Sequence, residues 1–182
     1  MTTPRREQLL GVAAGLMAER GYHGVSINDL GAAAGVSGPA LYRHFANKRA
    51  VLGEMLVGIS QRLLDGGRMR VAAGGGLPAL LEFHVEFALA EPDLIRVQDR
   101  DLASTTAADR SRVRRLQRAY VELWVGQLRA VRPDLAEAGA RARVHAVFGL
   151  LNSTPYAGRG LDRAQMAQLL RGLGSAALLA EV

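Results

Sequence analysis

Apolar residues recur at spacings of three and four along nearly the whole chain, and no segment shows the strict apolar and polar alternation of a half-buried strand. In residues 4–20 this spacing places Leu9, Ala13 and Met17 on one helical face. Gly21 follows, where a helix commonly ends in a left-handed residue. The pattern therefore predicts an all-α chain whose first helix spans residues 4–20.

Capping residues predict three further helices in the first third of the chain. Ser26 and Asp29 have the spacing of an acidic capping box, and Gly35 is placed to end the helix that they begin. Ser37 and Asn47 are placed to cap the next two helices. We expect these three helices to run to about residues 34, 45 and 64.

Residues 66–77 interrupt this pattern, because five of these twelve residues are glycine and such a composition favours a loop. After them, prolines and apolar stripes predict five more helices, at about residues 78–90, 92–102, 107–131, 134–153 and 162–179. The sequence thus predicts about nine helices.

Composition narrows the class of protein. The 182 residues suffice for one domain or for a small module joined to a medium one, and no apolar run reaches the roughly 18 residues of a membrane span. The start of the chain lacks the continuous apolar stretch of a secretory signal, so we expect a cytoplasmic protein with no membrane partner. Because the chain has no cysteine, it has neither disulfides nor thiolate metal sites.

Catalytic patterns are missing from the sequence. The four histidines lie far apart, none has the carboxylate spacing of a helical zinc site, and no phosphate-binding glycine loop follows a strand. We therefore expect no catalytic residues, no metal site and no cofactor, and a protein that is not an enzyme.

The net charge of +6 is concentrated toward the N-terminus. Residues 1–50 hold six basic and three acidic side chains, and the other half of the excess is spread over the rest of the chain. A basic N-terminal segment is suited to a polyanionic partner such as nucleic acid.

Residues 29–45 have the arrangement of a helix-turn-helix, in which two short helices are joined by a turn that contains glycine. Gly35 permits the positive φ of that turn, and Leu30, Leu41 and Phe45 are spaced to face a small core. The outward side of the second helix then carries Gly38, Pro39, Tyr42, Arg43 and His44. Such a helix is thin enough to enter the major groove of DNA.

Four motifs follow one another within residues 8–52: Gly21-Tyr22, Val25-Ser26-Ile27, Ala34-Gly35-Val36-Ser37 and the run from Leu41 to Leu52. In this order and with these gaps they resemble the TetR/AcrR family of bacterial transcriptional repressors. The resemblance implies a three-helix DNA-binding head over residues 1–50. It also implies a helical ligand-binding and dimerisation domain over residues 51–182.

The resemblance also implies roles in DNA binding. Positions that bind phosphates are matched by Ser26, Tyr42, His44 and Lys48, and the recognition helix and its start by Ser37, Gly38, Pro39 and Arg43. Arg43 is the best candidate for reading a base, because arginine pairs bidentately with guanine O6 and N7. Asn28 could reach a base edge from the preceding helix. Arg5 and Arg6 leave two interpretations open, an arm that touches DNA and a solvated terminus.

A dimeric reader of DNA needs a symmetric interface, and the final two helices carry apolar stripes suited to a four-helix bundle between two chains. We expect a homodimer formed through these helices. Its two recognition helices would bind a palindromic operator in double-stranded DNA.

Several residues behind the head are candidates for a ligand cavity. The internal aromatic residues are Phe83, Phe87, Trp124 and Phe148. Arg96 and Asp99 belong to a segment whose position in the family lies near the cavity mouth, where Arg96 could meet an anionic effector. Asn152 could bind a polar group of the ligand. Core packing, ion pairing and helix capping are the competing explanations for these residues.

The function that these observations predict is transcriptional repression that a small-molecule effector relieves. The effector would favour a conformation of the dimer that binds operator DNA poorly. An activator and a regulator without effector are the alternatives within transcription. A helical enzyme or a small-molecule carrier is the alternative outside it, and it leaves the pattern of residues 25–49 unexplained.

Overall fold

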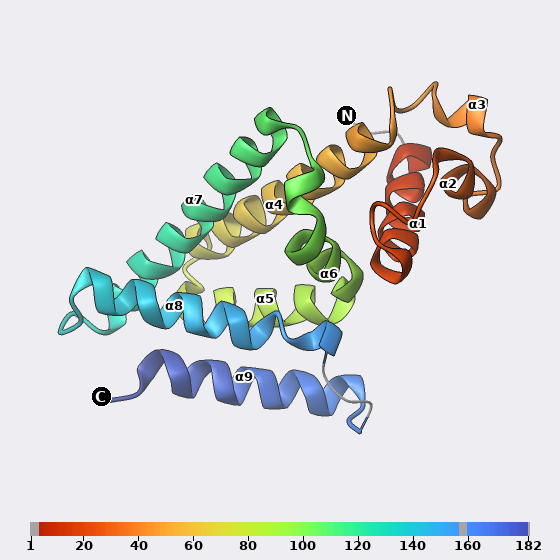
Figure 1. The fold of residues 1–182 in the computed structure, drawn as a ribbon. Helices are drawn as coiled ribbons and strands as arrows, with labels where there is room; N and C mark the ends of the chain where they lie inside the picture. The colour runs from red at the N-terminus through yellow and green to blue at the C-terminus, as the bar shows by residue number, and fades with distance from the viewer. Residues whose placement is uncertain (1–3, 157–159, 182) are drawn as a thin grey trace. The chain divides into compact units, whose positions relative to one another are not determined.

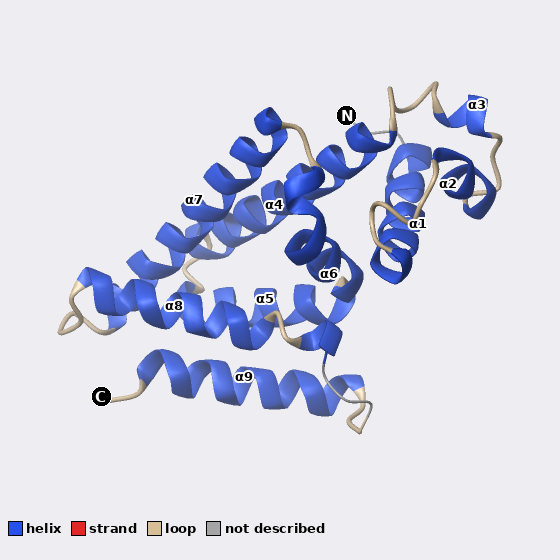
Figure 2. Ribbon diagram, viewed as in Figure 1, coloured by secondary structure: helices blue, strands red, loops and turns tan. Residues whose placement is uncertain are grey.

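Helices account for all the regular structure in a computed structural model that describes residues 4–156 and 160–181 (Figures 1 and 2). The α-helices are α1 (Pro4–Arg20), α2 (Ile27–Ala33), α3 (Gly38–Leu41), α4 (Lys48–Ala72), α5 (Gly76–Ala90), α6 (Pro92–Asp101), α7 (Ala107–Val131), α8 (Glu137–Leu151) and α9 (Arg163–Leu179). Two 3-10 helices, η1 (Leu102–Ser104) and η2 (Thr154–Tyr156), follow α6 and α8. The predicted all-α class is confirmed.

The chain divides into two compact units, each built from two stretches of sequence. The head unit comprises residues 1–60 and 93–114, and the body unit comprises residues 61–92 and 115–182. The head unit holds α1, α2, α3, α6 and the first parts of α4 and α7, and the body unit holds the remaining helices. The functional division at residue 50 stays a prediction.

Local sequence signals correctly placed the start of α2 and the turns that follow α1 and α2. The Ser26 hydroxyl oxygen accepts a hydrogen bond from the Asp29 backbone N–H at 3.1 Å, and the Asp29 carboxylate accepts one from the Ser26 backbone N–H at 2.8 Å. This is the reciprocal capping box that satisfies two backbone donors at a helix start. Gly21 and Gly35 have φ values of +79° and +65°, which favour glycine at these two turns.

The second helix of the helix-turn-helix is shorter than predicted. We expected a helix to about Phe45, but α3 ends at Leu41, and the residues after it form a tight turn. In that turn the His44 backbone N–H donates to the Leu41 carbonyl at 2.9 Å, a three-residue step tighter than the α-helical one. A four-residue helix that contains glycine and proline has little stability of its own.

The predicted loop over residues 66–77 is wrong. Helix α4 continues to Ala72 and α5 begins at Gly76, so only residues 73–75 connect them. A Cβ atom built at Gly66 would lie 2.3 Å from Cζ of Phe83, and one at Gly67 would lie 2.8 Å from Cε2 of Tyr120. These two glycines therefore permit close packing within the body unit, whereas their composition had indicated flexibility. The other helix boundaries after residue 75 agree with the prediction within three residues.

In the body unit, α9 packs along both α5 and α8 and runs antiparallel to α8 (Figure 1). Trp124 from α7 and Val144 and Val147 from α8 are completely buried in its core. Two arginines hold the C-terminal end of α9: Arg132 donates to the Leu179 carbonyl at 2.8 Å, and Arg143 donates to the Ala180 carbonyl at 2.6 Å. Cations at this end of a helix satisfy free carbonyls and complement the helix dipole.

In the head unit, α6 is fastened to the C-terminal end of α1. The Asp101 carboxylate, which is buried, accepts a hydrogen bond from the Tyr22 backbone N–H at 3.3 Å. The neighbouring Arg100 donates to the carbonyls of Met17 and Ala18 and pairs with Asp101. Residues 79 positions apart in sequence thus complete the end of the first helix.

Among the described residues, no helix is long and apolar enough to cross a membrane.

Candidate nucleic-acid interface

The helix-turn-helix has the predicted core and the predicted outward face. Leu30, Leu41 and Phe45 are each no more than 3% exposed, whereas the side chain of Tyr42 is 54% exposed. The predicted DNA-binding residues that lie exposed are Ser26, Asn28, Ser37, Pro39, Tyr42 and Arg43, while His44 and Lys48 are half-buried and Gly38 begins α3. They lie on α2 and α3, on the residues that flank these two helices, and at the start of α4 (Figure 1).

Arg43 differs from most arginines in this chain. Its guanidinium is exposed and makes no hydrogen bond or ion pair with any residue that the structure describes. Other arginines of the head unit, such as Arg5, Arg6 and Arg100, bind carbonyl or carboxylate oxygens. A free guanidinium on an exposed turn is available for an external partner.

Ser26 and Lys48 are committed to contacts inside the head unit. The Ser26 hydroxyl donates to the Asp29 carboxylate at 2.5 Å, and this hydrogen bond lowers the pKa of Asp29. The Lys48 ammonium donates to the carbonyls of Tyr22 at 2.7 Å and Val25 at 2.6 Å, and it lies 4.2 Å from the centre of the Tyr22 ring. Two of the three N–H donors of Lys48 thus tie α4 to the segment between α1 and α2.

Arg5 and Arg6 are neither a free arm nor a solvated terminus. Arg5 donates to the Ala34 carbonyl at 3.1 Å, at the end of α2, and Arg6 binds Glu54 on α4. Both side chains therefore fasten α1 to the helices that follow it.

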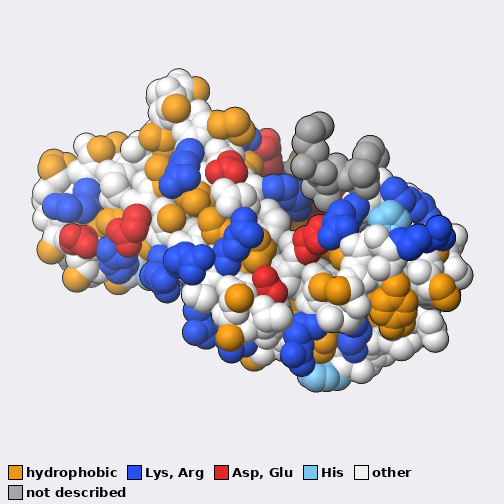
Figure 3. Space-filling view, turned by 90° about the horizontal axis from the view of Figure 1, so that it is seen from above, with side chains coloured by type: hydrophobic (Ala, Val, Ile, Leu, Met, Phe, Trp, Pro, Cys, Tyr) orange, Lys and Arg blue, Asp and Glu red, His pale blue; other side chains and the backbone are white. Residues whose placement is uncertain are grey.

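Lys and Arg side chains predominate over acidic ones on the face drawn in Figure 3.

The predicted ligand residues are distributed over both units. Phe87, Trp124, Phe148 and Asn152 come together in the body unit around His84, which is only 2% exposed. Phe83 lies outside this cluster. Its ring packs against Gly66, and the guanidinium carbon of Arg70 lies 3.8 Å from the centre of that ring. Arg96 and Asp99 lie on α6 in the head unit.

His84 is the centre of a buried polar and aromatic cluster. Its Nε2 lies 3.0 Å from Oδ1 of Asn152, and its Nδ1 lies 3.3 Å from the Tyr120 hydroxyl. The rings of Tyr120 and Phe148 are nearly parallel to the imidazole, and the Trp124 ring stands nearly perpendicular to it. We call these five side chains the His84 cluster.

Burial controls the protonation of this cluster. Removal from water lowers the pKa of His84 to about 4, and the hydrogen bond with Asn152 opposes that shift only in part. Burial likewise raises the pKa of Tyr120. The Trp124 indole N–H is buried and lacks a hydrogen bond of regular geometry, although it lies close enough to the Tyr120 hydroxyl to oppose part of that rise. The cluster is therefore neutral at pH 7 and keeps one donor free.

Sequence reasoning missed His84 and Tyr120 as members of the site. The available signal was a histidine one turn from Phe87 on α5, a helix that is otherwise nearly apolar. Spacing alone could not identify its partners, because Tyr120 and Asn152 are 36 and 68 positions away. Within the described residues, no group of three or more histidines and carboxylates is placed to hold a metal ion.

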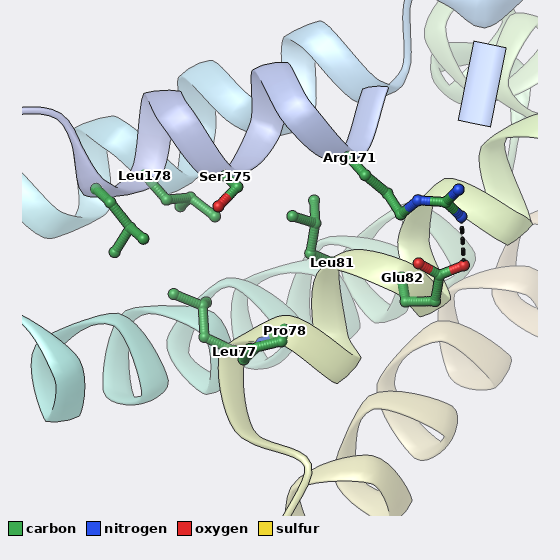
Figure 4. Close-up of a pocket in the computed structure, with 8 residues that line it drawn as sticks. Leu77, Pro78, Leu81, Glu82, Arg171, Ser175 and Leu178 are labelled. Atoms are coloured by element: carbon green, nitrogen blue, oxygen red, sulfur yellow. Dashed lines mark hydrogen bonds and ion pairs between the residues drawn. The ribbon is translucent and has the colours of Figure 1, made fainter. Parts of the chain in front are cut away.

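A shallow groove of about 230 Å³ lies between α5 and α9 (Figure 4). Its walls are mainly apolar and are formed by Leu77, Pro78, Leu81, Ser175, Leu178 and Leu179. At one end, Arg171 pairs with Glu82 at 2.7 Å. The two helices approach closely here, because a Cβ atom at Gly174 would lie 2.8 Å from Cδ1 of Leu81.

The outer faces of α8 and α9 expose apolar and small side chains. On α9, Leu169 and Leu173 are 44% and 46% exposed. On α8, Ala142, Ala146 and Gly149 are exposed and recur at helical spacing. Exposed leucines beside small residues are typical of a surface that another helix pair covers.

Comparison with known proteins places these features among bacterial regulators. Residues 9–55 match the family described as bacterial regulatory proteins, tetR family. The chain is 32% identical over 131 residues to the transcriptional repressor KstR2 of Rhodococcus jostii. That alignment covers 69% of this chain but only 64% of the relative, less than two thirds of its length.

Solved structures share the whole fold. A TetR-family regulator from Bordetella parapertussis superposes with a TM-score of 0.82 at 24% identity, covering 93% of each chain. The structure of AibR in complex with isovaleryl coenzyme A and operator DNA superposes with a TM-score of 0.71 at 17% identity, covering 93% of this chain and 97% of that one. At these identities the similarity establishes the arrangement of the helices.

Proposed function

Because this chain belongs, through residues 9–55, to the tetR family of bacterial regulatory proteins, we propose that it is a DNA-binding transcriptional repressor. The observation that carries the proposal is the exposed turn of the helix-turn-helix, where Tyr42 and Arg43 project from a segment whose core residues are buried. The relative from Rhodococcus jostii is itself named a repressor.

The proposed contacts divide by the chemistry of the side chains. Arg43 reads a base edge in the major groove, and Asn28 is a second candidate for that role. Phosphates are bound by Tyr42, His44, Ser37 and the backbone at the start of α3, with Gly38 and Pro39 allowing close approach. Ser26 and Lys48 are proposed to reach phosphates with whatever donor capacity their internal hydrogen bonds leave.

We propose that the repressor is a homodimer whose interface is the outer face of α8 and α9. The exposed Leu169 and Leu173 would be covered by the same helices of the second chain, which gives a symmetric four-helix contact. Two heads related by a two-fold axis suit a palindromic operator. The functional division at residue 50 follows from this proposal.

The proposed effector binds in the region of the His84 cluster. The free Trp124 indole N–H and the neutral His84 and Asn152 pair suit an oxygen acceptor on a largely hydrophobic or amphipathic molecule. AibR, whose fold this chain shares, was solved with an acyl coenzyme A, and we propose a ligand of related chemistry. Phe87 and Phe148 would supply apolar contacts. The ligand-binding roles expected for Phe83, Arg96 and Asp99 stay predictions.

No catalytic role is proposed for any residue. A regulator of this kind works where bacterial DNA lies, so we place it in the cytoplasm. The reciprocal coupling between effector and operator would act through the dimer.

The test is selection of genomic DNA by the purified chain. Fragmented genomic DNA is bound at moderate salt, and the retained fragments are sequenced. Enrichment of a discrete palindromic site is the expected result, and the genes beside it would narrow the search for the effector. Diffuse retention that disappears as salt rises would contradict a specific repressor.

A further inference from the structure

The recognition segment, which we define as residues 38–45, depends on neighbouring side chains for its conformation. Helix α3 has only four residues, and a helix of that length does not hold its conformation without tertiary contacts. From inside, Leu41 and Phe45 anchor it to the core of the head unit. The exposed side chains of Tyr42 and Arg43 lie between these two anchors, on a turn rather than on a regular helix.

Arg6 supplies a third anchor from outside that core. Its Nε and Nη2 donate to the two carboxylate oxygens of Glu54 at 2.6 and 2.5 Å, a bidentate pair. Its Nη1 donates to the backbone carbonyl of His44, and its guanidinium carbon lies 4.4 Å from the centre of the Phe45 ring. One planar group thus links α1 to α4 and to the end of the recognition segment at once.

The combination of these contacts needs the guanidinium fork. Lysine has a single nitrogen at the end of a flexible stem, so it cannot present parallel donors to a carboxylate and a third donor to a carbonyl. Glu54 fixes the rotation of the fork, and the orientation of the His44 carbonyl follows from it. Both side chains are about one third exposed, at 30% and 33%, so a plain surface ion pair would contribute little stability here.

We propose that Arg6 and Glu54 form a positioning pair that sets the orientation of residues 42–44 and so determines operator specificity without contacting DNA. The inference rests on the proposed function, because it concerns how the recognition segment is presented to a base edge. Arg6 acts through the His44 carbonyl, and Glu54 acts through Arg6.

The rival explanation is that Arg6 binds a DNA phosphate directly. The two explanations make opposite predictions for Glu54→Gln. If charge alone matters, removal of a negative charge near DNA strengthens binding to every sequence. If Glu54 holds the Arg6 fork in place, the same substitution weakens binding to the operator and leaves binding to unrelated DNA unchanged or slightly tighter.

The experiment compares four full-length proteins: wild type, Glu54→Gln, Arg6→Lys and the control Glu7→Gln. Glu7 is exposed on α1 and makes no hydrogen bond or ion pair with the described residues of the recognition segment, so its substitution changes the net charge as Glu54→Gln does. Affinity for the selected operator and for a scrambled duplex of equal length is measured by fluorescence anisotropy at several salt concentrations. Thermal unfolding by circular dichroism checks that each variant folds.

The expected result is a loss of about tenfold in operator affinity for Glu54→Gln and Arg6→Lys, with scrambled affinity and the salt slope retained. Glu7→Gln should bind both duplexes at least as tightly as the wild type. Equal or tighter operator binding by Glu54→Gln would overturn the inference, as would a parallel loss on both duplexes. In either case the wild type would still select its operator, so the proposed function would stand. A wild type with no preference for any site would defeat the proposed function itself.

Discussion

The recognition segment in the head unit and the His84 cluster in the body unit differ in exposure and in internal contacts. Tyr42 and Arg43 are exposed, and the Arg43 guanidinium has no partner among the described residues. The members of the His84 cluster are mostly buried and contact one another. Substitutions in the first region should therefore change binding with little effect on folding, whereas substitutions in the second should change folding first.

The largest effect should come from Trp124→Ala. Trp124 is completely buried and touches His84, Tyr120 and Phe148, so its removal leaves a large cavity. We expect the free energy of unfolding to fall by about 3–5 kcal/mol. Urea denaturation at a fixed protein concentration measures this change. A loss below about 1 kcal/mol would show that the cluster is loosely packed and would end the contrast with the head.

Arg43→Ala tests the other side of the comparison. We expect operator binding to weaken by about 1–3 kcal/mol and discrimination at one base position to relax. The free energy of unfolding should stay within about 0.5 kcal/mol of the wild type, because the side chain is exposed. Titrations against the operator and its single-base variants, with urea denaturation alongside, separate the two quantities. A stability loss comparable with that of Trp124→Ala would contradict the distinction drawn here.

A pair of glycines on α4 sharpens the view of packing in the body. Gly66→Ala places a methyl group against the Phe83 ring, and we expect it to lower the free energy of unfolding by about 1–3 kcal/mol. Gly58→Ala, on the same helix, meets no atom within 4 Å and should raise it by about 0.5–1 kcal/mol. Urea denaturation of both variants gives the signs. A gain in stability for both variants would mean that helix propensity, not contact with Phe83, governs these positions.

A further prediction for the His84 cluster concerns pH. The pKa of His84 is lowered to about 4 in the folded chain, whereas an unfolded histidine titrates near 6.5. Between these values the unfolded state binds one more proton, so the free energy of unfolding falls as pH falls. We expect the titration of His84 to make the free energy of unfolding about 2 kcal/mol lower at pH 5 than at pH 7.5.

A His84→Gln variant isolates this contribution, because glutamine does not titrate. Urea denaturation at pH 7.5 and pH 5 should show a smaller pH dependence for the variant than for the wild type. An identical dependence in both proteins would place the titration on other groups and would show that His84 is hydrated. The head offers a contrast, since Arg43→Ala should leave the pH dependence unchanged.

The elements that the sequence could predict are those whose causes lie within a few residues. The capping box of Ser26 and Asp29 and the left-handed turn at Gly35 are of this kind, and both are present. Helix α3 proved shorter, because its end depends on tertiary contacts that capping residues do not encode. Gly66 was misinterpreted for the same reason. A glycine is needed there because of the Phe83 ring, which belongs to a residue 17 positions away.

The candidate sites divide in the same way. The candidate DNA-binding residues follow one another within a short motif, so a single stretch of sequence sufficed to propose them. The His84 cluster joins α5, α7 and α8, and only the folded chain brings Tyr120 and Asn152 to the histidine. The motif did not reveal that the Lys48 ammonium also binds the carbonyls of Tyr22 and Val25, and its role at a phosphate stays a prediction.

The contact between Asp101 and the end of α1 has a consequence for synthesis on the ribosome. The Tyr22 N–H meets its acceptor only when a residue 79 positions later has emerged, and Arg100 must emerge to cover the last carbonyls of α1. Closing so long a loop is slow compared with forming local helices. The head unit is therefore completed only after α5 has been synthesised, and a nascent fragment cut before residue 100 would carry an unfinished head.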